Sequence, residues 1–316
     1  MFMDFWLVIF GFIFLIGGAE LCVRGASSIA ERLGISKSLI GLTIVALGTS
    51  LPEMIVSYVA SIEGEPSIAV GNVIGSNIAN ITLILGSAAL MSPLLTDKGI
   101  LRKEIPFMVL SALAILVFSL NSIISRLEGL LLLTMFAVFI GSTIMRYKQE
   151  TAQEDHSKGP KNHMALNLFI TLCGFVLLVF GGKWVVLGGK NLARGFGVSE
   201  WLIGLTIVAL GTSLPELATS MVAAFKGELE ISVGNVIGSN LFNSLCVLGG
   251  ATAICPAGVS HGEIYRDILL MVILSILIYP IARSGMQISR REGAFLLSAY
   301  LLFMISLIMS PQWSVF

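Results

Sequence analysis

The chain alternates between long apolar runs and short breaks that are polar or rich in glycine and proline. A helix that spans a membrane needs about 20 mainly apolar residues, and ten runs approach or exceed this length. They lie near residues 4–24, 38–62, 66–92, 104–122, 127–146, 165–188, 201–225, 231–255, 266–283 and 291–310. We therefore predict an all-α membrane protein with ten transmembrane helices.

Two segments of the sequence occur twice. Residues 41–53, GLTIVALGTSLPE, recur unchanged at 204–216, and residues 71–77, GNVIGSN, recur at 234–240. Both copies are displaced by 163 residues (204 minus 41). Five spans per copy is an odd number, so the copies must enter the membrane from opposite sides, as in many secondary transporters. We predict two inverted-topology five-helix repeats with broken helices at the core.

The longest polar stretch divides these repeats. It has no apolar periodicity and is predicted to be a flexible linker. The predicted boundaries are residues 1–146 for the first repeat (spans 1–5), 147–163 for the linker and 164–316 for the second repeat (spans 6–10). With both termini placed outside, fourteen Lys and Arg residues fall on the cytoplasmic side and five on the other. This bias predicts external termini and a cytoplasmic linker.

Composition supports the membrane assignment and narrows the function. Charged residues make up 12% of the chain and hydrophobic residues 56%, whereas soluble domains carry about 25% charged residues. The net charge is zero, which gives no reason to expect nucleic acid as a partner. No nucleophile–base set is visible in the sequence, so an enzyme is not expected.

Two acids lie deep inside predicted spans. Glu53 is well within the second span and Glu216 holds the equivalent place in the seventh. A carboxylate at membrane depth costs a few kcal/mol or more, and neither span has a basic residue close to its acid. A bound cation would compensate the charge. A protonated glutamic acid that hydrogen-bonds between helices is the structural alternative.

Prolines precede both acids and should break the helices there. Pro52 and Pro215 have no N–H group, so the carbonyls of Gly48 and Gly211 lose their intrahelical donors. Unpaired carbonyls at membrane depth are tolerated only in a protein cavity or a wet site, and such carbonyls are good ligands for hard cations.

Side chains that carry oxygen recur at helical spacings of three or four residues. Thr49 and Ser50 lie four and three residues before Glu53, and the second half repeats this with Thr212 and Ser213 before Glu216. In the partner motif, pairs of such side chains are four residues apart: Ser76 with Asn80, and Ser239 with Asn243. The absence of thiolate and imidazole groups favours Ca²⁺ or Na⁺ over soft transition metals. Two carboxylates neutralise one Ca²⁺ or two Na⁺, so we predict that the ions compete for one site.

The motif GTSLPE followed by GNVIGSN, present twice in inverted copies, resembles the alpha repeats of the sodium/calcium exchanger family. This family belongs to the wider cation/Ca²⁺ exchanger superfamily, and the size of the chain resembles its compact prokaryotic members. The resemblance implies that the first and sixth helices slide across the core during transport. It also implies residence in a prokaryotic cell (inner) membrane.

The resemblance further implies roles for individual residues. Glu53 and Glu216 would be the central Ca²⁺ ligands, with the backbone carbonyls of Thr49 and Thr212 beside them. The sodium sites would be completed by Ser50, Ser213, Ser76, Ser239 and the carbonyls of Ala46 and Ala209. Asn80 matches the asparagine of the family's first repeat. Asn243 stands where some members have Asp, which argues against K⁺ co-transport.

We therefore predict a secondary active antiporter that exchanges Ca²⁺ for Na⁺ by alternating access. A Ca²⁺/H⁺ antiporter of the same superfamily and a cation channel are the alternatives. The serines next to both acids favour Na⁺ over H⁺ as the counter-ion, because hydroxyl oxygens are ligands for sodium, whereas a transported proton does not need them. The expected partners are Ca²⁺, Na⁺ (H⁺ in the alternative) and the lipid bilayer. No prosthetic group and no obligate protein partner are expected.

Overall fold

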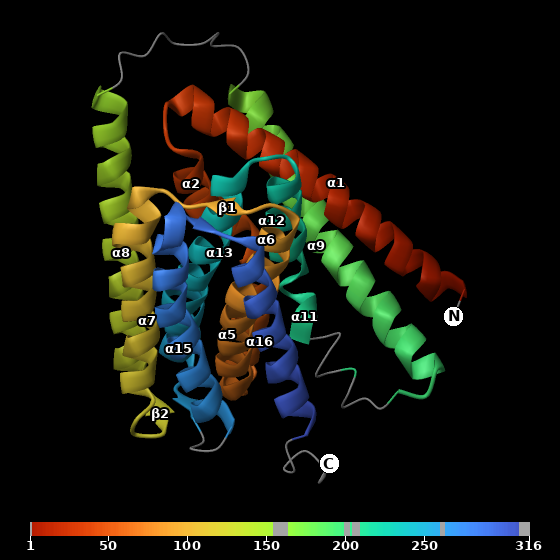
Figure 1. The fold of residues 1–316 in the computed structure, drawn as a ribbon. Coiled ribbons are helices and arrows are strands. Elements are labelled where there is room, and N and C mark those ends of the chain that lie inside the picture. Colours follow the sequence, from red (N-terminus) through yellow and green to blue (C-terminus); the bar gives the residue numbers. More distant parts are fainter. Residues whose placement is uncertain (1, 154–163, 199–202, 204–208, 260–262, 310–316) are drawn as a thin grey trace.

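The computed structural model describes residues 2–153, 164–198, 203, 209–259 and 263–309, and every structural statement below refers to these residues. Helix is present in all ten predicted spans (Figure 1). The first half contains α1 (Phe2–Leu33), α2 (Lys37–Ile40), the π-helical turn η1 (Gly41–Val45), α3 (Ala46–Thr49), α4 (Leu51–Ile62), α5 (Pro66–Ala79), the π-helical turn η2 (Asn80–Ile84), α6 (Leu85–Met91), the π-helical turn η3 (Ile100–Glu104), α7 (Ile105–Phe118) and α8 (Arg126–Gln153).

The second half repeats this order. It contains α9 (Met164–Gly195), α11 (Ala209–Gly211), α12 (Leu214–Phe225), α13 (Leu229–Leu241), the π-helical turn η6 (Phe242–Val247), α14 (Leu248–Ile254), α15 (Glu263–Arg283), the 3₁₀ turn η7 (Ser284–Met286) and α16 (Arg290–Ile308). Of the described helices, six are long and apolar enough to cross a membrane, and the bent pair Lys37–Thr49 and Leu51–Ile62 gives a seventh. Part of the seventh predicted span lies outside the described residues.

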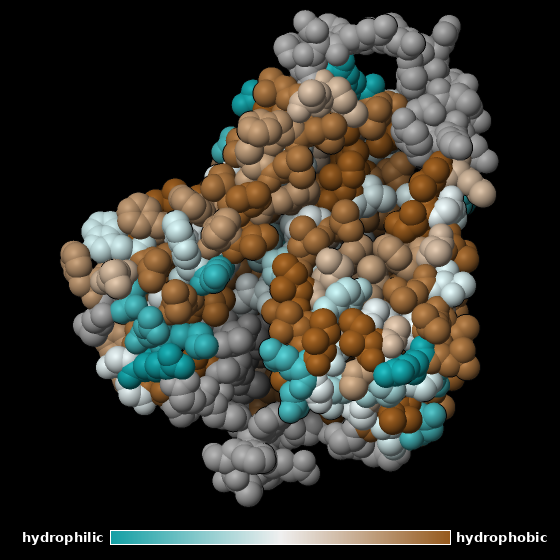
Figure 2. Space-filling model, turned by 180° about the vertical axis from the view of Figure 1, so that it is seen from behind, coloured by the Kyte–Doolittle hydropathy of each residue, from teal (hydrophilic) through white to brown (hydrophobic). Residues whose placement is uncertain are grey.

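The helices differ in how far they are buried. In the span Leu229–Ile254, 94% of the most apolar stretch is buried, and in Pro66–Met91 the share is 72%. The corresponding values for α1 and α9 are 33% and 22%. The two spans that carry the GNVIGSN motif therefore form the centre of the bundle. Hydrophobic residues cover most of the outer face seen in Figure 2, as expected of a surface in contact with lipid.

The helices α1 and α9 lie side by side and inclined to the bundle (Figure 1). Each has 32 residues and is therefore about 48 Å long, which exceeds the roughly 30 Å of hydrocarbon and requires a tilt. Glycines allow their backbones to touch. A Cβ atom built at Gly18 would lie 2.8 Å from the carbonyl oxygen of Gly174, and one at Gly174 would lie 2.7 Å from that of Gly18. The two helices thus pack as a tight pair.

Short strands join the two halves near the ends of the bundle. Strand β1 (Leu94–Leu95) pairs with β4 (Gln287–Ile288), and β2 (Ile123–Ile124) pairs with β3 (Ala257–Gly258), both antiparallel. The second pair is the counterpart of the first under the sequence repeat. Every strand therefore has its partner in the other half of the chain.

The helix α8 continues to Gln153, into the segment 147–163 that the sequence predicts as a linker. The prediction depended on missing apolar periodicity. A polar helix that extends beyond the membrane needs no apolar face, so periodicity could not reveal it. Residues 154–163 lie outside the described part of the chain.

Candidate cation site

Both spans that carry a predicted acid are interrupted three residues before it. Ser50 (φ −83°, ψ 6°) separates α3 from α4, and the axis bends there by 45°. Ser213 (φ −89°, ψ 4°) stands at the same place before α12. Pro52 and Pro215 occupy the first turns of the helices that follow, where a missing N–H group breaks no hydrogen bond. The predicted broken helices are confirmed.

The two acids meet at the crossing of these broken helices. The Ser50 hydroxyl donates a hydrogen bond of 3.0 Å to Oε1 of Glu216, and the Ser213 hydroxyl donates one of 3.1 Å to Oε1 of Glu53. Each acid thus contacts the serine that stands three residues before the other acid. Both acids are fully buried and lie in the first turn of their helices, where the helix dipole favours negative charge.

Several buried polar atoms of the predicted site residues have no partner among the described residues. Oε2 of Glu53 and Oε2 of Glu216 accept no hydrogen bond, and neither acid forms an ion pair there. The same lack of a hydrogen-bond partner is found for the hydroxyl of Ser239, Oδ1 of Asn80 and both polar side-chain atoms of Asn243. Buried polar atoms normally have partners. Oxygen atoms buried without partners in this number are typical of a site that coordinates a cation.

Two asparagines hold the threonines of the breaks. The Thr49 hydroxyl donates to Oδ1 of Asn235 over 3.2 Å, and the Thr212 hydroxyl donates to Oδ1 of Asn72 over 3.4 Å. The Asn72 amide also donates to the backbone carbonyl of Glu53. Each threonine side chain is therefore hydrogen-bonded to a helix of the other repeat. These bonds hold the turn that contains each break in place.

The structure also describes the other predicted site residues. The hydroxyl oxygens of Ser76 and Ser213 lie 3.1 Å apart, within hydrogen-bond distance. The Asn80 amide donates to Oδ1 of Asn240 over 3.0 Å. The carbonyl of Ala46 accepts from the backbone N–H of Ser50 at 3.0 Å. Ala209 begins α11, the helical turn equivalent to α3.

The sequence did not identify Ser57 and Ser220 as part of the site. The amide of Asn72 donates to the Ser57 hydroxyl at 3.0 Å, and that of Asn235 donates to the Ser220 hydroxyl at 2.9 Å. These serines follow the two acids by four residues in each repeat. That spacing places them on the helix face of the acid, and it was the signal available in the sequence.

The π-helical turns were also beyond sequence analysis. Asn80 begins η2 and Asn243 lies within η6. Turns of this kind are rare and often occur at functional sites. Here they insert a wider turn into both central spans, where η2 contacts α12 and η6 contacts α4.

The donor atoms of the site favour hard cations over soft metals. Among the described residues, no group of three or more His, Cys, Asp or Glu side chains could hold a metal ion. The site instead combines two carboxylates with hydroxyl, amide and carbonyl oxygens. This donor set suits a hard cation that accepts many oxygen ligands.

A cavity reaches the breaks from one side. It has a volume of about 410 Å³ and extends between α9 and the two broken helices. Its walls include Pro52, Val56, Val186, Thr212 and Pro215. A hollow between the part formed by α1 and α9 and the rest of the molecule is also visible in Figure 2. The cavity therefore extends to the second break at Thr212, whereas neither Glu53 nor Glu216 lines it.

Comparison with known proteins gives matches over nearly the whole chain. A family model described as "Sodium/calcium exchanger protein" matches residues 3–145 and 166–309. The sodium/calcium exchanger MaX1 of Methanosarcina acetivorans is 33% identical, over 96% of this chain and 98% of its own. The inner membrane protein YrbG of Escherichia coli is 34% identical, over 95% of each chain. A structure of the sodium-calcium exchanger NCX_Mj superposes with a TM-score of 0.87 at 31% identity, covering 97% of this chain and 99% of that one.

Proposed function

Because the chain belongs to the sodium/calcium exchanger family and exchanges Ca²⁺ for Na⁺ across the membrane, we propose that both ions bind in turn at one site between Glu53 and Glu216. The observation that carries the proposal is the reciprocal pair of serine–glutamate hydrogen bonds. It brings one buried carboxylate from each repeat to the same place and leaves Oε2 of each acid without a partner among the described residues.

In this proposal, the two acids balance the charge of one Ca²⁺ ion. Their two negative charges match its charge, and the first turns of α4 and α12 orient the carboxylates toward each other. The backbone carbonyls of Thr49 and Thr212 are the further Ca²⁺ ligands in this proposal. Their hydroxyls already donate to Asn235 and Asn72, which supports a role for the carbonyl rather than the side chain.

Sodium ions occupy the same acids in turn, assisted by neutral oxygens. The proposed additional ligands are the hydroxyls of Ser50, Ser213, Ser76 and Ser239 and the carbonyls of Ala46 and Ala209. A serine that donates its proton to a carboxylate keeps its oxygen lone pairs for a cation. Because the acids serve both ions, Ca²⁺ must leave before Na⁺ binds, and coupling follows from competition.

In this proposal, the side-chain amide oxygens of Asn80 and Asn243 complete the set of ligands without adding charge. They provide neutral oxygens next to the acids, so the site carries two negative charges and no more. A third acid would leave a charge that Ca²⁺ alone cannot balance. We therefore propose exchange that is independent of K⁺.

Alternating access follows from the inverted repeats, because exchange of the two repeats' conformations moves the opening to the opposite face. We propose that the termini lie outside, that segment 147–163 is cytoplasmic, and that the protein resides in a prokaryotic inner membrane. The proposal includes no enzymatic activity, no prosthetic group and no obligate protein partner. An occluded site of two acids in inverted halves also suits an exchanger better than a channel, which lines a continuous path.

The test is uptake of ⁴⁵Ca²⁺ into liposomes that contain the purified protein. An outward Na⁺ gradient should drive saturable uptake, whereas a pH gradient at equal Na⁺ on both sides should drive little. Uptake driven by the pH gradient alone would support Ca²⁺/H⁺ exchange and refute the proposal. Flux that needs no counter-ion would indicate a channel.

A further inference from the structure

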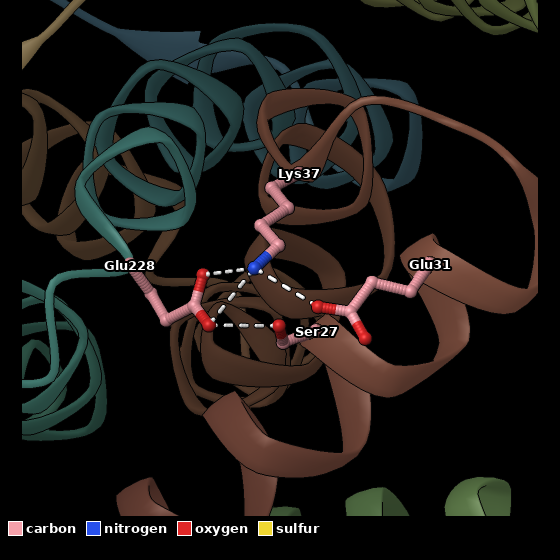
Figure 3. Close-up of polar contacts among 4 residues, drawn as sticks. All are labelled: Ser27, Glu31, Lys37 and Glu228. Carbon is pink, nitrogen blue, oxygen red and sulfur yellow. Dashed lines mark hydrogen bonds and ion pairs between the residues drawn. The ribbon is translucent and has the colours of Figure 1, made fainter.

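A cluster of polar side chains holds α1 against the core at one face of the protein (Figure 3). Nζ of Lys37 lies 2.9 Å from Oε2 of Glu228 and 3.1 Å from Oε1 of Glu31. The Ser27 hydroxyl donates to Oε1 of Glu228 over 2.8 Å. Since Ser27 and Glu31 belong to α1 and Glu228 caps α13, the cluster joins the tilted helix to the central span.

A second contact reinforces this connection. Nζ of Lys226, which follows α12, lies 2.7 Å from Oε1 of Glu20 in α1. Together, the contacts Glu20–Lys226, Ser27–Glu228 and Glu31–Lys37–Glu228 form what we call the α1 latch. It connects α1 to the broken span that carries Glu216 and to the span after it.

The sequence repeat gives this latch a counterpart at the opposite face. Glu20 corresponds to Lys183 (183 minus 20 is 163), and Lys226 corresponds to Glu63. The acid and the base have exchanged places, so the pair keeps its complementarity. Random divergence of a solvated surface would not be expected to change both partners together.

The next contact also keeps its complementarity, although no acid and base change places. Ser27 corresponds to Lys190, and Glu228 corresponds to Glu65, so a hydrogen bond in the first copy becomes a possible ion pair in the second. Within the described residues, neither Lys190 nor Glu65 forms an ion pair. Lys183 and Glu63 form none there either, and both are exposed.

The cavity described above lies beside the two lysines of this counterpart. Lys183 and Lys190 of α9 both line it, opposite Val56 of α4. Val56 is 40% exposed, whereas Thr219, its counterpart in the other repeat, is 0% exposed. Among the described residues, the position next to the formed latch is therefore covered, and its counterpart next to the unformed contacts is exposed.

We propose that the chain carries two mutually exclusive ionic latches, which set the balance between its two access states. The α1 latch closes one face, and an α9 latch, Lys183–Glu63 with Lys190–Glu65, closes the other. Because glycines pack α1 and α9 tightly together, movement of α9 onto the core draws α1 away from it. One latch then breaks as the other forms. This inference rests on the alternating access in the proposed function.

The test uses a cysteine as a reporter of the closed face. Thr219→Cys should react slowly with a charged maleimide in detergent, and its rate measures how often that face opens; the protein without this cysteine gives the background. Exposed ion pairs are weak, so Lys226→Glu should raise the rate by about two- to fivefold. Glu63→Lys should lower it by a similar factor, because it removes the competing latch.

Two further variants make the result specific. The exchange Glu20→Lys with Lys226→Glu should return the rate to that of the parent, because it recreates the pair with its charges reversed. Lys103→Glu applies the same charge change at an exposed residue outside both latches and should leave the rate unchanged. Elution as a single species shows that each variant is folded.

The inference is wrong if Lys226→Glu and Glu63→Lys shift labelling in the same direction, if neither shifts it, or if the charge exchange fails to restore the rate. The readout needs no transport. A normal labelling pattern with no Na⁺-driven Ca²⁺ uptake would therefore count against the proposed function and leave the two latches standing.

Discussion

Replacement of Glu53 by Gln changes one charge at the centre of the site and little else. The amide has nearly the same shape as the carboxylate, and its oxygen can still accept the Ser213 hydrogen bond at 3.1 Å. The loss is confined to one negative charge and one ligand oxygen that has no partner among the described residues. Glu216 would then be the one acid left to coordinate Ca²⁺ in the proposed site.

The size of the effect follows from burial. Both acids are 0% exposed, so water cannot replace the missing charge. Removal of one partner from a buried charge pair costs about 3–5 kcal/mol. At about 1.4 kcal/mol per factor of ten, Ca²⁺ affinity should fall by roughly 10²–10⁴-fold. A single Na⁺ remains balanced by Glu216, so its binding should weaken far less.

The assay is Ca²⁺ binding by calorimetry, followed by Na⁺-driven ⁴⁵Ca²⁺ uptake in liposomes, for Glu53→Gln and Glu216→Gln separately. The reciprocal geometry predicts losses of similar size for both. Glu128→Gln makes the same chemical change in the first turn of α8, far along the chain from the breaks, and serves as the control. Ca²⁺ affinity that stays within threefold of the parent in either variant would refute the two-acid site.

Three further predictions follow from the contacts. Ser213→Ala removes a hydroxyl that contacts Glu53 and should raise the half-saturating Na⁺ concentration of Ca²⁺ efflux about tenfold, with a smaller change for Ca²⁺; equal shifts for both ions would contradict a sodium role. Gly18→Ala places a Cβ 2.8 Å from the Gly174 carbonyl and should destabilise the protein by about 1–3 kcal/mol, whereas Gly17→Ala, with nothing described within 4 Å, should not lower the Tm in detergent. Asn243→Asp adds a third negative charge and should make Ca²⁺ uptake depend on an added monovalent cation such as K⁺; unchanged uptake in medium without K⁺ would contradict the charge balance.

The sequence was sufficient to predict the fold because the membrane limits the choices. Apolar runs of spanning length must form helices there, and the repeat at residues 41–53 and 204–216 fixed the inverted relationship of the halves. The breaks were predictable as well, since Pro52 and Pro215 cannot continue the hydrogen-bond ladder. What periodicity could not give was the end of α8, because a polar helix outside the membrane leaves no apolar pattern.

The composition of the site was predictable in part. Glu53 and Glu216 stood out because a buried carboxylate is costly in the membrane. That each acid contacts the serine beside the other depends on how two helices cross, and spacing along one chain carries no such information. Spacing alone places Ser57 and Ser220 on the helix faces of the acids, but their contacts could not be predicted, since their partners Asn72 and Asn235 come from a neighbouring span.

The strand pairs have a consequence for biosynthesis. Leu94 can pair only after Ile288 has been synthesised, and Ile124 can pair only after Ala257 has been synthesised. The amino-terminal half must therefore remain incomplete in the bilayer until nearly the whole polypeptide has left the ribosome. Two separately expressed halves should accordingly assemble into a working protein, while either half alone should be a substrate for membrane proteases.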